Sequence, residues 1–179
     1  MSSYHQQDID GCEYTMSVLR EKLNIINWKH TEGDYDRYDM DMSAVTISTG
    51  ELHHICDENK DRRYGWKYDD DGNASIDYDN PQYISTYPSQ MFNFEKYEAM
   101  MNNYEQTGDW QGYTVGYLDG VILFDVTTLP KDKIYTELKD GGWKVYKWIR
   151  EKTMDGRTEK VLQPRFLIPN EYGTIYYKK

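Results

Sequence analysis

The chain has 179 residues, 38% of them hydrophobic, which is enough for one domain with a sizeable core, and we expect a single domain over residues 1–179. No apolar run approaches the ~20 residues that span a bilayer, and the polar start lacks the apolar region of a secretory signal. We therefore expect no membrane partner and a cytoplasmic location. Two cysteines, Cys12 and Cys56, exclude a disulfide-rich class.

The net charge of −10 is unevenly distributed along the chain. Residues 1–130 carry 9 basic against 24 acidic residues, whereas residues 131–179 carry 12 basic against 7 acidic residues. Acidic surface repels phosphate, which argues against a nucleic-acid partner. A metal-dependent nuclease can nevertheless hold an acidic centre that a cation neutralises, and bind DNA through a basic segment. Ordinary solvated surface explains the same bias.

The first predicted element is a helix over about residues 11–26, with Asp10 as its N-cap. Its apolar residues recur at alternating steps of four and three, the spacing of one helix face. They are Cys12, Met16, Leu19, Leu23 and Ile26. This stripe predicts a helix that packs on a sheet, followed by a short strand over residues 27–30.

Residues 38–63 form the stretch in which acidic residues, a tight turn and a lysine converge. Alternating and β-branched residues predict a strand over residues 40–48 and a returning strand over residues 51–60. Thr49 and Gly50 between them indicate a turn. The stretch is therefore predicted to be a β-hairpin.

The register of this hairpin selects the candidate site. If the turn has two residues, Ser48 pairs with Glu51, and counting back along both strands pairs Asp41 with Glu58. Lys60 emerges on the same face because side chains alternate along a strand. Two carboxylates and an ammonium so placed predict a site for Mg²⁺ and water.

Two further observations on this hairpin keep alternatives open. Asp39 would face Lys60 in the same register, where a cross-strand salt bridge explains it, and a slipped register would change which aspartate meets Glu58. His53, His54 and Cys56 are residue types that bind zinc. The two histidines point to opposite faces, however, and no second cysteine or histidine pair follows, so the spacing argues against structural zinc.

The remaining chain predicts a border for the site and further elements. Residues 61–90 read as an inserted hairpin or long loop beside a cleft, where Arg62 and Arg63 could contact phosphate. Lys144, Lys147 and Arg150 alternate with aromatic residues, as on a nucleic-acid surface or an amphipathic hairpin. The other predicted elements are a helix over 94–104 with Asn93 as N-cap, a hairpin of strands 113–118 and 121–126, a short helix over 131–139, and a hairpin around Asp155-Gly156.

Asp41, followed by Glu58-Asn59-Lys60 at the end of the next strand, resembles the PD-(D/E)xK motif of restriction-endonuclease-like nucleases. The helix and strand pair over residues 94–126 are similar to the corresponding part of phage-type members. Over about residues 8–130 the resemblance implies an α/β fold with a central mixed β-sheet flanked by helices, in the order αβββαβ. Residues 131–179 would add a basic C-terminal β-hairpin.

The resemblance also implies roles for the site residues. Asp41 and Glu58 would bind Mg²⁺ or Mn²⁺, Asn59 would offer its backbone carbonyl, and Lys60 would orient or deprotonate the water that attacks a DNA phosphodiester. The first helix often adds a metal ligand in this family, and Glu13 matches that residue better than Glu21. A favourable charge in the first turn of the helix explains Glu13 equally well.

The functional hypothesis from the sequence is thus a metal-dependent DNA endonuclease with DNA as partner, a homodimer as one assembly, and a viral gene as one origin. Lys96 and Gln90 lie where some members of the family place auxiliary residues, although solvation of a helix surface explains both. The second hypothesis is a non-catalytic acidic binding protein on the same fold, a DNA mimic or an inhibitor of a nucleic-acid-binding protein partner.

Overall fold

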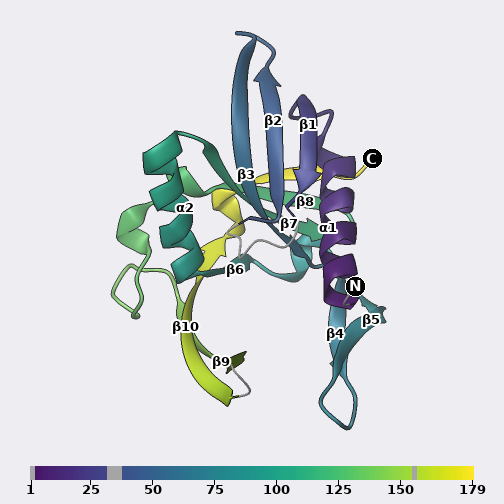
Figure 1. Ribbon diagram of the computed structural model, residues 1–179, viewed down its shortest axis with the longest axis vertical. Coiled ribbons are helices and arrows are strands. Elements are labelled where there is room, and N and C mark those ends of the chain that lie inside the picture. Colours follow the sequence, from purple (N-terminus) through teal and green to yellow (C-terminus); the bar gives the residue numbers. More distant parts are fainter. Residues whose placement is uncertain (1–2, 32–37, 155–156) are drawn as a thin grey trace.

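A mixed β-sheet organises the part of the chain that the computed structural model describes, which is residues 3–31, 38–154 and 157–179, with side chains for residues 6–31, 38–145 and 163–179. Six strands of these residues form the sheet in the order β1-β2-β3-β7-β8-β11 (Figure 1). Only the β3 and β7 pair is parallel. The strands are β1 (Ile25–His30), β2 (Met40–Thr46), β3 (Glu51–Asp61), β7 (Trp110–Tyr117), β8 (Gly120–Asp125) and β11 (Thr174–Tyr177).

Helices α1 (Ser3–Leu19) and α2 (Phe94–Thr107) lie on opposite sides of this sheet (Figure 1). The core beside α1 includes Cys12, Met16 and Leu19 of the helix packed with apolar side chains of β1, β2, β3 and β8. The core beside α2 includes Tyr97 and Met100 with aromatic side chains of β7 and β8. The prediction of an α/β fold with a central mixed sheet flanked by helices is confirmed.

The first helix lies earlier in the chain than predicted. Asp10 is inside α1 rather than at its N-cap, and Ile26 is on β1 with 55% of its surface exposed. The helix stops because Asn24 adopts a positive φ of 50°, and the Ile25 N–H then donates to the carbonyl of Arg20. Asparagine tolerates this left-handed conformation better than most residues, which makes it a natural stop.

The predicted register of the β2–β3 hairpin is wrong by two residues. Thr46 pairs with Glu51 across a four-residue turn, so Asp41 faces Cys56 and not Glu58. The Gly50 N–H donates to the Thr46 carbonyl at 2.7 Å, and Gly50 has a positive φ of 69°. A left-handed glycine at the last loop position closes a longer loop than the two-residue turn that was assumed.

Two smaller sheets flank the main one. Strands β4 (Tyr64–Tyr68) and β5 (Ala74–Pro81) form the hairpin predicted for residues 61–90. Strands β9 (Val145–Met154) and β10 (Arg157–Pro169) form the predicted C-terminal hairpin, and β10 also pairs with β6 (Ser89–Asn93). Short 3-10 turns complete the described elements: η1 (Ile84–Thr86), η2 (Val126–Thr128), η3 (Lys131–Lys133) and η4 (Asn170–Tyr172).

The segment after β8 departs from its prediction. The helix predicted over residues 131–139 is wrong, because helical structure stops at Lys133. Trp143 is buried, and its N–H donates to the Lys133 carbonyl at 2.8 Å, which folds the segment back on itself. Strand β11, which pairs with β8, was not predicted. Among the described residues, no helix combines the length and apolarity required to cross a membrane.

Helix α2 begins at a strong cap that also positions the candidate site. The Asn93 side chain accepts hydrogen bonds from the N–H groups of Glu95 at 2.9 Å and Lys96 at 3.3 Å. Gly108 ends the helix with a positive φ of 73°. This cap confirms the predicted start of the helix, which continues to Thr107, beyond the predicted end at residue 104. It also fixes the first turn that carries Lys96.

We predict that Asn93→Ala lowers the free energy of unfolding by about 1 kcal/mol, because two N–H groups of the first turn lose their acceptor. Asn102→Ala is the matched control, since Asn102 is an exposed residue inside α2. Alanine there favours the helix and should leave stability equal or higher. Urea denaturation of both variants tests this, and equal losses would contradict the capping role.

Candidate functional site

Strand β3 delivers polar side chains to both faces of the sheet within four residues. Glu58 and Lys60 point to the side of α2, whereas Asp57 and Asn59 point to the side of α1, as the alternation of a strand requires. Asn59 Nδ2 donates to Thr15 Oγ1 of α1 at 2.7 Å, and Lys96 of α2 pairs with Glu58. Polar groups of β3 thus contact α1 on one face and α2 on the other.

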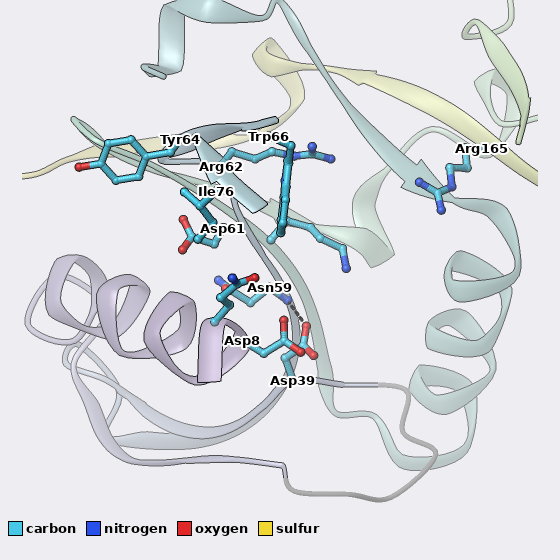
Figure 2. A pocket seen from close by; sticks show the side chains of 11 residues that line it. Asp8, Asp39, Asn59, Asp61, Arg62, Tyr64, Trp66, Ile76 and Arg165 are labelled. Atoms are coloured by element: carbon cyan, nitrogen blue, oxygen red, sulfur yellow. Dashed lines mark hydrogen bonds between the residues drawn. The ribbon is translucent and has the colours of Figure 1, made fainter. Parts of the chain in front are cut away.

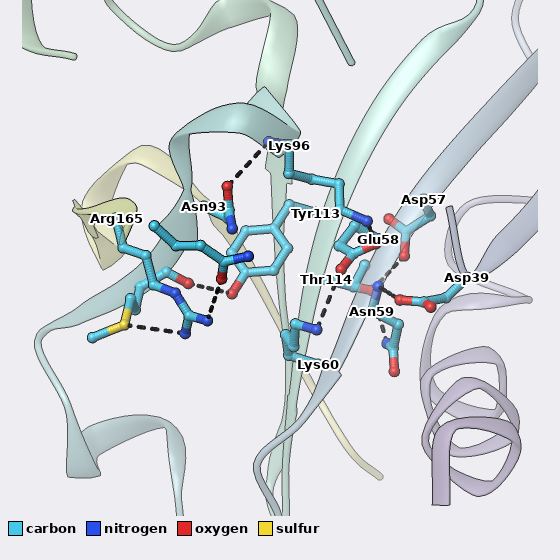
Figure 3. A network of polar contacts seen from close by, with 12 residues as sticks. Asp39, Asp57, Glu58, Asn59, Lys60, Asn93, Lys96, Tyr113, Thr114 and Arg165 are labelled. Carbon is cyan, nitrogen blue, oxygen red and sulfur yellow. Dashed lines mark hydrogen bonds and ion pairs between the residues drawn. The ribbon is translucent and has the colours of Figure 1, made fainter. Parts of the chain in front are cut away.

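The edge of β3 opens where β2 begins. The Asp39 N–H donates to the Asp57 carbonyl at 2.9 Å, and one Asp39 carboxylate oxygen accepts the Asn59 N–H at 2.8 Å (Figure 3). An N–H and C=O of one strand residue point to the same edge, so the Asn59 carbonyl also faces the side of Asp39. Asp39 thus occupies the position opposite Glu58 that the sequence assigned to Asp41.

Glu58 is held by two ammonium groups. Lys60 Nζ lies 3.3 Å from one carboxylate oxygen and Lys96 Nζ lies 3.0 Å from the other (Figure 3). Glu58 is only 5% exposed, whereas the Lys60 side chain is 49% exposed. Burial lowers the pKa of Lys60, but Glu58 and Asp39 raise it further, and the net shift is upward. Lys60 therefore stays protonated at neutral pH.

Asp57 contributes a further, fully buried carboxyl group. Thr114 Oγ1 donates to one of its oxygens at 2.5 Å, and within the described residues the other oxygen has no hydrogen-bond partner. Gly112 makes room for it, because a Cβ at that position would lie 2.4 Å from this oxygen. Burial raises the pKa of Asp57 well above its usual value, the Thr114 bond opposes this, and Asp39 and Glu58 raise it further.

Asp39 feels the same accumulation of negative charge. Burial and the nearby Glu58 raise its pKa to about 7, although Lys60, the Asn59 N–H and Lys96 act in the opposite direction. Lys60 and Lys96 therefore do not fully offset the effects of burial and of Glu58 on this carboxyl group. A bound cation would supply positive charge and favour the ionised form.

An open cleft of about 270 Å³ is lined by Asp39, Asn59 and Lys60, whereas Glu58 lies buried behind them. Figure 2 shows the carboxylates of Asp8 and Asp39 on the same side of the cleft as Asn59, with Arg62 and Trp66 across from them. The β4–β5 hairpin forms one wall, as predicted for an insertion that borders a site. The lining residues are Gln7, Asp8, Asp39, Asn59, Lys60, Asp61, Arg62, Tyr64, Trp66, Ile76 and Arg165.

The acidic residue that α1 brings to the cleft is Asp8. The candidate Glu13 is exposed and does not line the cleft. Successive residues of a helix project in different directions, so Glu13 points away from the buried face that carries Cys12. Glu21 follows the helix and lines a separate pocket with Lys22. Asp8 precedes Cys12 by four residues and lies on the same helix face. The sequence pattern did not reveal it, because the predicted helix begins only at residue 11.

Asp41 lies with a different set of residues. One of its carboxylate oxygens is 3.0 Å from His54 Nε2 and 3.9 Å from Cys56 Sγ, and the other is 3.9 Å from Lys29 Nζ. Asp41 and Glu58 were predicted to face each other, and this pairing is wrong because the turn is longer by two residues.

The predicted nucleic-acid contacts divide into three groups. Arg62 lines the cleft, whereas Arg63 pairs with Asp61 at 2.7 Å and stacks over Tyr14. Lys144 is exposed and is not among the lining residues. The side chains of Lys147 and Arg150 lie outside the described residues. Arg165 of β10 lines the cleft instead.

Comparisons with protein-family models, curated proteins and solved structures find no match to this chain. The function must therefore be inferred from the chain's own geometry. That geometry gathers Asp39, Glu58, Lys60 and the Asn59 backbone where the two faces of the sheet meet.

The protonation of Asp39 predicts a pH dependence of stability. An unfolded aspartate has a pKa of about 4, so between pH 4 and 7 the folded protein retains a proton that the unfolded chain releases. The free energy of unfolding therefore falls as the pH rises through this range. Asp39→Asn should reduce the fall between about pH 5 and 8 by on the order of 2 kcal/mol.

Urea denaturation at both pH values with a chelator present measures this difference. Asp70→Asn is the control, because Asp70 is exposed in the turn between β4 and β5. That substitution should leave the pH dependence unchanged. Identical pH dependence in Asp39→Asn and the unmodified protein would show that Asp39 does not hold the proton.

Proposed function

We propose that this protein is a metal-dependent DNA endonuclease whose site is built from Asp39, Glu58, Asn59 and Lys60. The observation that carries the proposal is the hydrogen bond from the Asn59 N–H to Asp39, since it brings the aspartate to the strand that bears Glu58 and Lys60. With Asp39 in place of Asp41, the residues are those of the PD-(D/E)xK pattern.

The donor set suits Mg²⁺ or Mn²⁺. Carboxylate and carbonyl oxygens are the ligands these hard cations prefer, and Asp39, Glu58 and the Asn59 carbonyl would provide them. Asp8 lines the same cleft and would add a carboxylate from α1. When bound, the cation would polarise the phosphate and lower the pKa of a coordinated water. The raised pKa of Asp39 is the sign of an acidic site that lacks this charge.

Lys60 is proposed to orient the attacking water and to stabilise charge on the phosphate. Its pKa is raised, so at neutral pH it has no lone pair with which to remove a proton. Of the two roles that the family resemblance allows, positioning therefore fits this chain better than general base. Lys96 holds the other oxygen of Glu58 and would fix the direction of that carboxylate.

The walls of the cleft suit a nucleic-acid strand. Arg62 and Arg165 line it and would pair with phosphate oxygens. Trp66 of β4 is also in the lining and is 39% exposed, which offers a flat surface for stacking with a base. A local basic wall thus accompanies the acidic centre, although the chain as a whole is acidic.

One observation favours the second candidate function, an acidic binding protein without catalysis. The ammonium groups of Lys60 and Lys96 together compensate the charge of Glu58, so this carboxylate does not require a metal ion for charge balance. A DNA mimic that occupies another protein's nucleic-acid channel would need no metal and would use the net charge of −10 directly. Failure to bind either Mg²⁺ or DNA at low salt would support this function over the endonuclease.

The most informative comparison is between Asp39, just before β2, and Asp41, two residues later within β2. With Mg²⁺ or Mn²⁺, the purified protein should cut DNA, tested on linear, circular, branched and single-stranded substrates. Asp39→Asn and Lys60→Met should each lower the cleavage rate by at least about 100-fold. Asp41→Asn is the matched control and should retain cleavage, because Asp41 faces Cys56.

Circular dichroism and thermal denaturation should show that all three variants are folded. Loss of cleavage in Asp41→Asn with retention in Asp39→Asn would refute the site as described. Cleavage that persists in Lys60→Met would remove the proposed role of this ammonium group.

DNA binding tests the proposed walls independently of cleavage. Arg62→Ala should weaken binding to a duplex that is not cleaved because Ca²⁺ replaces Mg²⁺. It should also reduce the slope of log K against log salt concentration by about one. Arg20→Ala is the control, since Arg20 is exposed beyond the far end of α1, roughly 18 Å along the helix axis from Asp8. Equal effects of the two variants in fluorescence anisotropy would argue against binding in the cleft.

A further inference from the structure

We propose that Asp41, His54 and Cys56 form a second metal site, selective for a transition-metal ion such as Zn²⁺, with Asp109 as the group that orients the histidine. The three side chains lie on one face of the β2–β3 pair, since Asp41 is directly opposite Cys56 and His54 is two residues along β3. This site is separate from the proposed Mg²⁺ site and does not depend on nuclease activity.

The ligand atoms are already close enough to share one ion. Asp41 Oδ1 is 3.0 Å from His54 Nε2 and 3.9 Å from Cys56 Sγ, and all three ligand atoms lie within 4.8 Å of one another. Tetrahedral zinc with bonds of about 2.0 Å to N and O and about 2.3 Å to S separates its ligand atoms by roughly 3.3–3.6 Å. Small side-chain adjustments reach this geometry and leave a fourth position for water.

Asp109 fixes the tautomer that metal binding requires. It lies just before β7, and its carboxylate is 2.8 Å from His54 Nδ1. A proton on Nδ1 that is donated to Asp109 leaves the lone pair of Nε2 directed at Asp41 and Cys56. Carboxylate, histidine and metal in this order are the usual arrangement around protein-bound zinc.

The short contact between His54 Nε2 and Asp41 Oδ1, at 3.0 Å, marks the place that the cation would occupy. The carboxylate of Asp41 and a Cys56 thiolate would together neutralise a divalent ion.

The donor atoms of Asp41, His54 and Cys56 do not suit Mg²⁺, the cation of the proposed nuclease site. Thiolate and imidazole are soft or intermediate ligands that select zinc and similar ions, whereas Mg²⁺ prefers oxygen alone. A thiolate nucleophile is a poorer explanation of the cluster. His54 Nε2 is engaged with Asp41 and not with the thiol, so the cluster lacks the base that would activate Cys56.

A metal at this position would join two strands, because Asp41 comes from β2 and His54 and Cys56 come from β3. Asp109, just before β7, would hold His54 and not the ion. Asn103 of α2 also contacts the site, because its Nδ2 lies 3.8 Å from Cys56 Sγ. The ion would therefore link β2 to β3 on the face that also carries Asn103.

Binding of Zn²⁺ and Co²⁺ to the metal-free protein tests the proposal. Calorimetry should give one Zn²⁺ per chain in the presence of excess Mg²⁺, and Co²⁺ should give the visible bands of tetrahedral coordination with a thiolate-to-cobalt charge-transfer band. Cys56→Ser should abolish that band. Asp109→Asn, which alters only the partner of His54, should weaken Zn²⁺ binding by about 10–100-fold.

Two matched controls separate this site from its neighbours. His53→Gln changes the adjacent histidine, which stacks on Trp110 with ring centroids 3.9 Å apart, and Glu58→Gln changes the proposed Mg²⁺ site. Both should bind Zn²⁺ as the unmodified protein does. Absence of the charge-transfer band in the unmodified protein, or equal Zn²⁺ affinity in Asp109→Asn, would overturn the proposal.

Discussion

The hydrogen bond between the Asn59 N–H and the Asp39 carboxylate is the interaction on which the site depends. It forms at the point where β2 begins, so the edge of β3 beyond Asp57 is free to accept a side chain instead of a strand. Through this bond a carboxylate on one strand reaches the backbone that lies between Glu58 and Lys60. The open edge also lets Asp8 of α1 line the same cleft.

Placing these carboxyl groups close together in a buried region costs electrostatic free energy. Burial raises the pKa values of Asp39, Asp57 and the Cys12 thiol, and the mutual proximity of Asp39, Asp57 and Glu58 raises them further. Lys60 and Lys96 pair with Glu58, and they offset the shift of Asp39 only in part. Raised pKa values of buried carboxyl groups are frequent at functional sites, and they accord with the proposed cation site. The same strand pair carries the softer donors of the second proposed site.

The sequence predicted the elements better than the register. Residue types at caps and turns identified α2 and the β7–β8 hairpin, because Asn93, Gly108 and Asp119-Gly120 act locally. The choice between Asp39 and Asp41 could not be made in this way. A shift of two residues keeps Met40 and Met42 on the buried face, so hydrophobic alternation is identical in both registers. Only the length of the turn before Glu51 distinguishes them. The sequence argued against structural zinc because His53 and His54 point to opposite faces and no second cysteine or histidine pair follows. Asp41, which lies beside His54 in the structure, is 13 residues away in the chain.

The position of a bound Mn²⁺ ion tests the central claim most directly, because its anomalous scattering identifies the ion in a crystal without reference to activity. A crystal of the protein with Mn²⁺ should show an anomalous peak bounded by Asp39, Glu58 and the Asn59 carbonyl. A peak beside Asp41 and Glu58, or no peak near Glu58 at saturating Mn²⁺, would contradict the account.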